Sequence, residues 1–273
     1  MGPIAKILKK QLTGHVYRST FYYFYPKITH MPLLRQVPNL ISLLNLLCGV
    51  LAVIFAVHNN LAIAALFVLA GIFFDFFDGL AARLLGVQGD LGKQLDSLAD
   101  VVTSGVAPGI VMFQLLGGDQ ADFFTTAFSD EGNLLPFLGL LIPLSAAYRL
   151  ANFNIDARQS TSFIGLPTPA AALLVVSLPL ISTYQPTASL QGLIDSNWFL
   201  IAVTLLVVHL MNAPLALFSL KFQHFTWKDN RLKGIFLLCS LCALCLWQLI
   251  AIPVIIVGYI LLSVLGNYWP VKK

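Results

Sequence analysis

Four aspartates lie close together in the sequence, at spacings that suit metal chemistry. Asp75 and Asp78 are three residues apart, and Asp96 and Asp100 are four residues apart. On α-helices these spacings place both members of a pair on one face. Clustered carboxylates without His or Cys are the ligands that Mg²⁺ and Mn²⁺ prefer. The spacing therefore predicts a carboxylate metal centre, with enough ligands for two ions, at the meeting of two helices.

The residues around the aspartates favour phosphoryl transfer. Two metal ions held by carboxylates stabilise the attacking and leaving oxygens of such a reaction. Gly79 and Gly92 lack side chains where a base or a diphosphate must approach the backbone, and Arg83 supplies a fixed cation for phosphate. A single aspartate in a membrane helix would suggest a helix–helix hydrogen bond, but four at these spacings favour a site. Asp90 is expected to be the N-cap of the second helix.

The helices that carry these aspartates are predicted to cross a membrane. The chain of 273 residues is 58% hydrophobic and only 10% charged, whereas soluble domains are about 25% charged. A helix of roughly 20 apolar residues crosses about 30 Å of hydrocarbon. Eight spans are predicted, at 38–57, 61–84, 94–116, 134–155, 167–184, 197–220, 232–249 and 251–269. An all-α integral membrane protein is expected, with Pro253 at the turn between the last two spans.

The basic residues predict the orientation in the membrane. With a cytoplasmic N-terminus and eight spans, all 16 Lys and Arg residues lie on the cytoplasmic side, as short cytoplasmic loops require. The largest opposite loop, "GGDQADFFTTAFSDEGN", is acidic and has no cation. The net charge of +4 therefore indicates topology and not nucleic-acid binding. We expect an inner-membrane protein with both termini and the active site on the cytoplasmic side.

Three parts of the chain are predicted. Residues 1–36 form a cytoplasmic, interfacial amphipathic segment, because apolar residues recur every four positions beside lysines and "FYYFY" provides an aromatic belt. A disordered tail is the alternative for this segment, and no signal peptide is evident. Residues 37–222 form the transmembrane core. Residues 223–273 add two C-terminal helices.

The pattern D-x-x-D-G-x-x-A-R-x8-G-x-x-x-D-x-x-x-D, over residues 75–100, resembles the signature of the CDP-alcohol phosphotransferases. Members of this family displace CMP from a CDP-linked lipid with an alcohol, in six core helices and usually as homodimers. The resemblance implies that Asp75, Asp78 and Asp96 bind metal, and that Asp100 both touches metal and acts as the base. It also implies a CDP-binding set, namely Asn39, Ser42, Gly79, Ala82, Arg83 and Gly92.

Three further stretches narrow the acceptor alcohol. "GKQLDSLADVVTSGVAPG", "LSAAYRLANFN" and "FIGLPTPAA" are similar to the type II phosphatidylserine synthases, which extends the likeness over about residues 37–180. This implies transfer of a phosphatidyl group from CDP-diacylglycerol to L-serine, giving phosphatidylserine and CMP. Serine brings a carboxylate, which Arg149 and Asn152 are expected to hold. The alternative for Arg149 is a topology anchor that reaches the membrane interface.

Other functions remain possible on the sequence alone. The signature is shared by members that use glycerol phosphate or inositol phosphate as the acceptor. An aspartate-rich membrane prenyltransferase would need a second acidic cluster, and the later cytoplasmic loops have none. A cation channel or transporter would need polar residues along a path to the other face. The covalent H-x-K type of phosphatidylserine synthase is excluded, because none of the five histidines begins an H-x-K.

Overall fold

The computed structural model describes residues 32–118, 123, 127–128, 132–156, 163–217 and 227–268. Most of the predicted interfacial segment and of the acidic loop lies outside these residues. The described part is helical apart from one short pair of strands. In chain order the elements are α2 (Pro32–Val57), α3 (Leu61–Leu85), α4 (Asp90–Asp100), η1 (Val101–Val106), α5 (Ala107–Phe113), η2 (Gln114–Gly118), η3 (Leu135–Leu140), α7 (Leu141–Ile155), β1 (Phe163–Ile164), α8 (Thr168–Tyr184), α9 (Ala188–Ile194), α10 (Asn197–Asn212), β2 (Ala216–Leu217), α11 (Trp227–Trp247), η5 (Gln248–Ile250) and α12 (Ala251–Tyr268).

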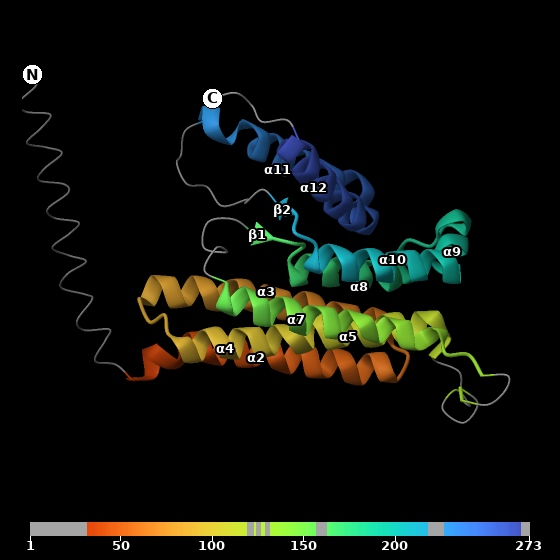
Figure 1. The fold of residues 1–273 in the computed structure, drawn as a ribbon, viewed down its shortest axis with the longest axis horizontal. Helices are drawn as coiled ribbons and strands as arrows, with labels where there is room; N and C mark the ends of the chain where they lie inside the picture. The colour runs from red at the N-terminus through yellow and green to blue at the C-terminus, as the bar shows by residue number, and fades with distance from the viewer. Residues whose placement is uncertain are drawn as a thin grey trace, which may run out of the picture.

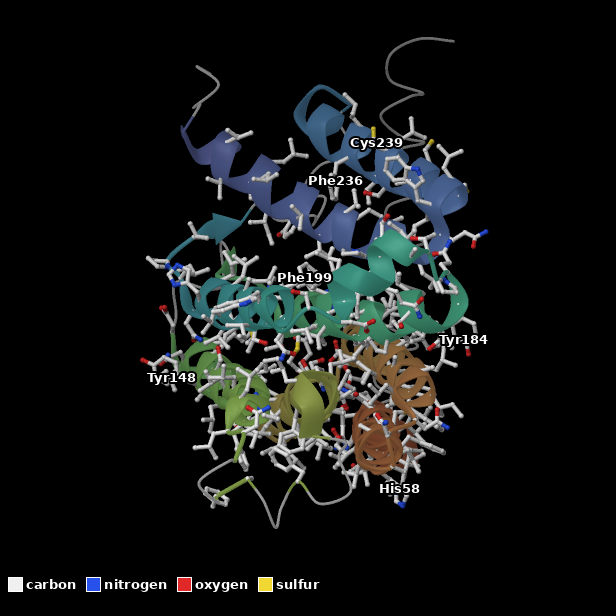
Figure 2. The ribbon with its side chains drawn as sticks, turned by 90° about the vertical axis from the view of Figure 1, so that its right-hand side faces the viewer. His58, Tyr148, Tyr184, Phe199, Phe236 and Cys239 are labelled. Carbon is white, nitrogen blue, oxygen red and sulfur yellow. The ribbon has the colours of Figure 1, made fainter. Side chains whose placement is uncertain are left out.

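The helices are arranged in three layers (Figure 1). The first layer contains α2, α3, α4, α5 and α7, the second contains α8, α9 and α10, and the third contains α11 and α12. Figure 2 shows the same order from the side, from His58 after α2, through Tyr184 at the end of α8, to Phe236 on α11. Strands β1 and β2 pair antiparallel and join the segment before α8 to the segment after α10.

Small side chains let the first two layers pack closely. Ala52 on α2, Ala65 on α3, Ala107 on α5 and Ala172 on α8 are fully buried in one cluster. Where side chains are small, helix backbones in a membrane can approach each other and gain van der Waals contact. A larger apolar cluster, centred on α5, α7, α8 and α10, continues the core towards the third layer. The helices that carry the aspartates are thus held by packing along their length.

The all-helical membrane fold is confirmed, but fewer spans meet the requirements for crossing than the eight predicted. In the described residues five helical stretches are long and apolar enough, or six if the bent pair α9 and α10 counts as one span. The predicted span 167–184 is α8, which has 17 residues. It lies at the lower limit of the range of about 17–25 residues for a helix that crosses the hydrocarbon. The predicted span 197–220 ends early, at Asn212, because Pro214 disfavours helix in the residue before it.

The last two predicted spans form one apolar stretch, Gly234–Leu265, that bends at Gln248. Gln248 has a φ of 50°, in the left-handed region. The prediction of a turn at Pro253 is wrong, since Pro253 lies in the first turn of α12. A proline is tolerated there because the first N–H groups of a helix have no acceptor within the helix. α11 and α12 then lie against each other, with the rings of Phe236 and Tyr259 6.1 Å apart.

Candidate active site

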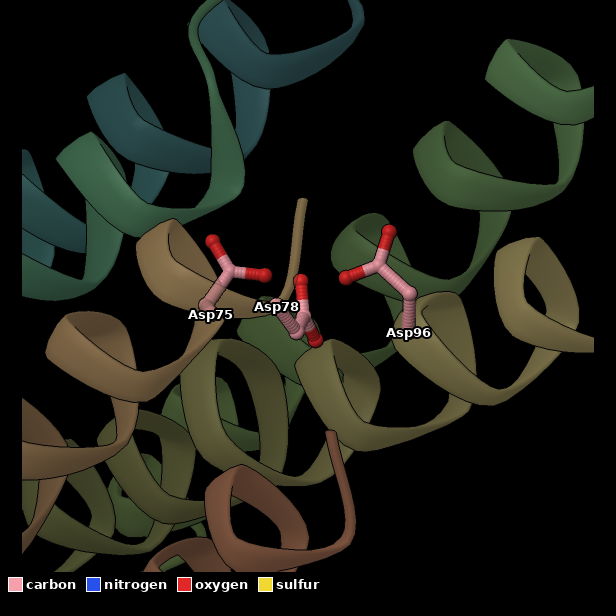
Figure 3. A group of neighbouring side chains, drawn as sticks. All are labelled: Asp75, Asp78 and Asp96. Carbon is pink, nitrogen blue, oxygen red and sulfur yellow. The ribbon is translucent and has the colours of Figure 1, made fainter. Parts of the chain in front are cut away.

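Three of the four aspartates converge on one point between α3 and α4 (Figure 3). Asp75, Asp78 and Asp96 each offer a carboxylate oxygen, and these oxygens lie within 4.8 Å of one another. Asp78 is buried, and Asp75 and Asp96 are half-buried. Asp100 lies one turn beyond Asp96, is also buried, and lies close enough to Asp75 for their charges to interact. The structure thus brings the two predicted pairs together, with Asp100 at the inner edge of the cluster.

A tight connection sets the register between the two aspartate helices. Gly86 ends α3 with a φ of 64°, and its backbone N–H donates to the carbonyls of Ala82 and Arg83. Glycine adopts this left-handed conformation without steric cost, which makes it a common helix terminator. The predicted N-cap role of Asp90 is wrong, because Gly89 holds that position and α4 begins at Asp90. A carboxylate in the first turn still interacts favourably with the helix dipole.

The donor set fits hard divalent cations. Carboxylates within a membrane are costly and repel one another unless cations neutralise them. Within the described residues, the three converging aspartates form no salt bridge with Lys or Arg, and no His or Cys belongs to the cluster. An all-oxygen set of this kind suits Mg²⁺ or Mn²⁺ better than zinc.

A cavity of about 730 Å³ opens beside the cluster, within the range of about 300–1,000 Å³ that is usual for ligand sites. Asp78 and Asp96 form part of its wall. All six residues of the predicted CDP-binding set line it, namely Asn39, Ser42, Gly79, Ala82, Arg83 and Gly92. Further lining residues that sequence reasoning did not assign to the site include Gln88, Lys93 and Phe153.

Glycines and cations lie along the wall of this cavity. An added Cβ at Gly79 would meet only the Arg83 guanidinium among the described residues, at 3.9 Å, so the glycine leaves open space. At Gly92 an added Cβ would lie 3.3 Å from the Asn39 side-chain oxygen, which is crowded. Arg83 is held by its Nε, which donates to the Gly79 carbonyl at 2.8 Å. Lys93 donates from Nζ to the Asn154 carbonyl at 2.9 Å, which ties the start of α4 to the end of α7.

One face of α2 is polar and faces the aspartates. The Ser42 hydroxyl donates to Asp78, and Asn45 Nδ2 donates to Asp100 Oδ1 at 3.2 Å. Sequence reasoning included Asn39 and Ser42 but missed Asn45. The signal was present, because the three residues recur every third position and such residues share a helix face.

Arg149 and Asn152, the predicted serine-binding pair, do not meet in the structure. Arg149 is only 8% exposed and lies close enough to Asp100 for their charges to interact. This burial contradicts the alternative of a topology anchor, which would extend into the interface. Asn152 instead lines a second cavity, of about 520 Å³, together with Asp156 and Asn212. Arg149 and Asn152 lie three residues apart on α7, but Asn152 lines the second cavity and Arg149 lines neither of the two.

The fold and the cavity define an integral-membrane transferase with a carboxylate centre at one end of its helix bundle. The chain belongs to the CDP-alcohol phosphatidyltransferase family, whose model matches residues 35–210, more than half of its length. The matched region ends within α10, so α11 and α12 lie outside it.

Curated relatives have consistent names. The CDP-diacylglycerol–serine O-phosphatidyltransferase of Bacillus subtilis (strain 168) is 35% identical over 173 residues, which cover 62% of this chain and 88% of the relative. The archaetidylserine synthase of Methanothermobacter thermautotrophicus is 31% identical over 180 residues, which cover 65% of this chain and 69% of the relative. A CDP-diacylglycerol–serine O-phosphatidyltransferase of Helicobacter pylori (strain J99) is 35% identical over 141 residues, covering 51% of this chain and 55% of the relative.

Proposed function

We propose that this protein is a CDP-diacylglycerol–serine O-phosphatidyltransferase, which converts CDP-diacylglycerol and L-serine to phosphatidylserine and CMP. The observation that carries the proposal is that the predicted CDP-binding residues and the carboxylate cluster share one cavity. The names of the relatives support serine as the acceptor.

Asp75, Asp78 and Asp96, with Asp100 beside them, would hold Mg²⁺ or Mn²⁺, and two ions would suit four carboxylates. When bound, such ions neutralise diphosphate charge and stabilise the oxygens of attacking and leaving groups. Asp78 and Asp96 line the cavity that would admit the diphosphate, so the cluster is open to it.

The residues of the chain would do the rest of the chemistry. Arg83, fixed on the Gly79 carbonyl, would bind the diphosphate through its remaining guanidinium N–H groups. Asp100 would accept the proton of the serine hydroxyl, because an unactivated hydroxyl is a weak nucleophile near neutral pH. The serine oxygen would form a bond to the β-phosphorus, and the bond from that phosphorus to the CMP oxygen would break. No Ser, Cys or His of the signature is placed to form a covalent phosphatidyl intermediate, so we propose a single direct displacement.

Arg149 would bind the carboxylate of serine. Its guanidinium is buried beside Asp100, and its Nε has no hydrogen-bond partner within the described residues. A guanidinium fork matches the two oxygens of a carboxylate, and this geometry gives both affinity and orientation. Serine held in this way would present its hydroxyl next to the proposed base.

We also propose a cytoplasmic site in the inner membrane and a homodimer. Arg83 lies in the last turn of α3. Lys93 lies in the first turn of α4 and bonds to the end of α7, so cations gather at the same end of the bundle as the aspartates. Lys and Arg collect on the cytoplasmic side of membrane proteins. The homodimer is what the family resemblance implies, and cross-linking in native membranes tests it.

The deciding experiment supplies purified protein with CDP-diacylglycerol and Mg²⁺ or Mn²⁺. Serine, glycerol 3-phosphate and inositol phosphate are then offered separately, and the release of CMP is measured. We expect CMP release with serine and none with glycerol 3-phosphate or inositol phosphate. Release with one of the phosphorylated alcohols, and none with serine, would assign the chain to another branch of the family.

A further inference from the structure

We propose that Asn45 is a positioning residue that sets the orientation of the Asp100 carboxylate. The inference rests on the proposed function, in which Asp100 is the base. Asn45 lies on α2, outside the aspartate signature, and belongs neither to the predicted CDP-binding set nor to the residues that line the cavity.

The contact between the two side chains is fully enclosed. Asn45 is 0% exposed and Asp100 is 8% exposed, and Asn45 Nδ2 donates to Asp100 Oδ1 at 3.2 Å. An ionised carboxylate only accepts hydrogen bonds. A neutral amide donor on one carboxylate oxygen therefore fixes the group while leaving the other oxygen for the proton, and it adds no charge to the cluster.

A residue in the turn that follows Asp100 holds the backbone at Asn45. Immediately after Asp100 the chain forms a π-helical turn, η1, and the Thr103 hydroxyl of this turn donates to the Asn45 carbonyl at 3.0 Å. π-helical turns within helices are frequent at functional sites. An added Cβ at Gly49 would lie 2.9 Å from the Thr103 Cα, so a glycine is required for this approach.

The amide itself is confined on its other side. An added Cβ at Gly71 of α3 would lie 2.9 Å from Asn45 Oδ1, so α3 packs directly on the amide. Asn45 Oδ1 is buried and has no hydrogen-bond partner within the described residues. Since buried polar atoms are almost always paired, this arrangement costs stability. A leucine of similar size would avoid that cost, and the donor to Asp100 is the feature that only the amide provides.

The test replaces Asn45 by a residue of similar volume that cannot donate. In Asn45→Leu we expect kcat to fall about 10–100-fold, the usual effect of removing a partner that orients a ligand or base. The KM values for serine and CDP-diacylglycerol should stay within about threefold, because Asn45 does not line the cavity. A role in folding alone would instead lower the amount of active enzyme and leave kcat per folded molecule unchanged.

Gln114→Leu is the matched control. Gln114 is another buried amide that bonds to α2, and its Nε2 donates to the carbonyls of Ala56 and Val57 at 3.1 and 3.2 Å, at the opposite end of that helix. This variant loses a comparable buried contact far from the aspartates. We expect an unchanged kcat.

A double variant separates positioning from a general structural effect. Asp100→Glu moves the carboxylate away from Asn45. In that background, adding Asn45→Leu should lower kcat by a smaller factor than it does in the wild-type enzyme. If Asn45→Leu does not fold, Asn45→Ala, which also has no donor, is judged by the same criteria.

The outcomes distinguish this inference from the proposed function. A wild-type enzyme that releases no CMP with serine would overturn the proposed function. An active wild-type enzyme whose Asn45→Leu variant matches Gln114→Leu in kcat would overturn the role of Asn45 alone. The role of Asn45 would also be overturned if the double variant loses kcat by the product of the factors for Asn45→Leu and Asp100→Glu.

Discussion

Replacing Arg149 by methionine tests how the acceptor is recognised. Methionine fills most of the buried volume of the arginine stem but has no charge and no N–H donor. Hydrogen bonds to charged groups contribute about 1.5–3 kcal/mol each, and about 1.4 kcal/mol changes an equilibrium constant tenfold. Loss of the guanidinium fork should therefore raise the KM for serine by about 10-fold to 150-fold. The KM for CDP-diacylglycerol should change by less than about threefold.

A second arginine gives the matched control for this prediction. Arg83 lines the cavity with the predicted CDP-binding residues and is exposed there, whereas Arg149 is buried beside Asp100. Arg83→Met should raise the KM for CDP-diacylglycerol and leave that for serine nearly unchanged. Arg149→Lys should give an intermediate effect, because lysine keeps the charge but lacks the fork.

The assay measures CMP release while each substrate is varied with the other saturating. The reasoning is refuted if Arg149→Met raises both KM values equally, or if it lowers kcat alone. Either result would mean that Arg149 supports the carboxylate cluster and does not bind the acceptor.

The remaining predictions concern the metal, the mechanism of phosphatidyl transfer and the contact of Gln185 with η5. Chelation with EDTA should abolish CMP release, and Asp96→Asn should act likewise; full turnover in EDTA would exclude a metal requirement. Asp100→Asn should bind CDP-diacylglycerol with an affinity within a few-fold of wild type but lose turnover. Asp75→Asn should lose nucleotide affinity as well, and titration of both variants with CDP-diacylglycerol measures the difference. Labelled CMP should not exchange into CDP-diacylglycerol without serine, and rapid exchange would establish a covalent intermediate. The Gln185 amide oxygen accepts from the backbone N–H groups of Leu249 and Ile250 at 2.9 and 3.2 Å. Gln185→Leu should therefore lower the free energy of unfolding by about 1–3 kcal/mol without changing KM. A calorimetric scan in detergent measures this loss, and an unchanged transition would contradict the prediction.

The convergence of the aspartates could be predicted because it depends on local periodicity. Residues three or four apart share a helix face whatever the rest of the chain does. A short connection then makes the two helices antiparallel neighbours, so the pairs Asp75 with Asp78 and Asp96 with Asp100 had few other places to meet. The same reasoning explains why the predicted CDP-binding residues of α3 and α4 line one cavity.

Features that depend on the packing of distant helices were predicted less well. Asn152 was paired with Arg149 from their spacing, but Asn152 lines the second cavity and Arg149 is buried beside Asp100. Asn45 was missed because its partner, Asp100, is 55 residues away in sequence. The bend at Gln248 was missed because it is fixed from outside its own segment, by the side chain of Gln185.

The site also separates the chemistry from the choice of acceptor. The carboxylates and the residues of the proposed nucleotide site lie on α2, α3 and α4, whose register is set by the Gly86 turn and by the hydrogen bonds of Ser42 and Asn45. Arg149 comes from α7, which reaches α4 through the hydrogen bond of Lys93. A change on α7 can therefore alter what is held beside Asp100 without moving the carboxylates. On the proposed role of Arg149, one aspartate signature can serve different acceptor alcohols, and the serine preference lies on α7.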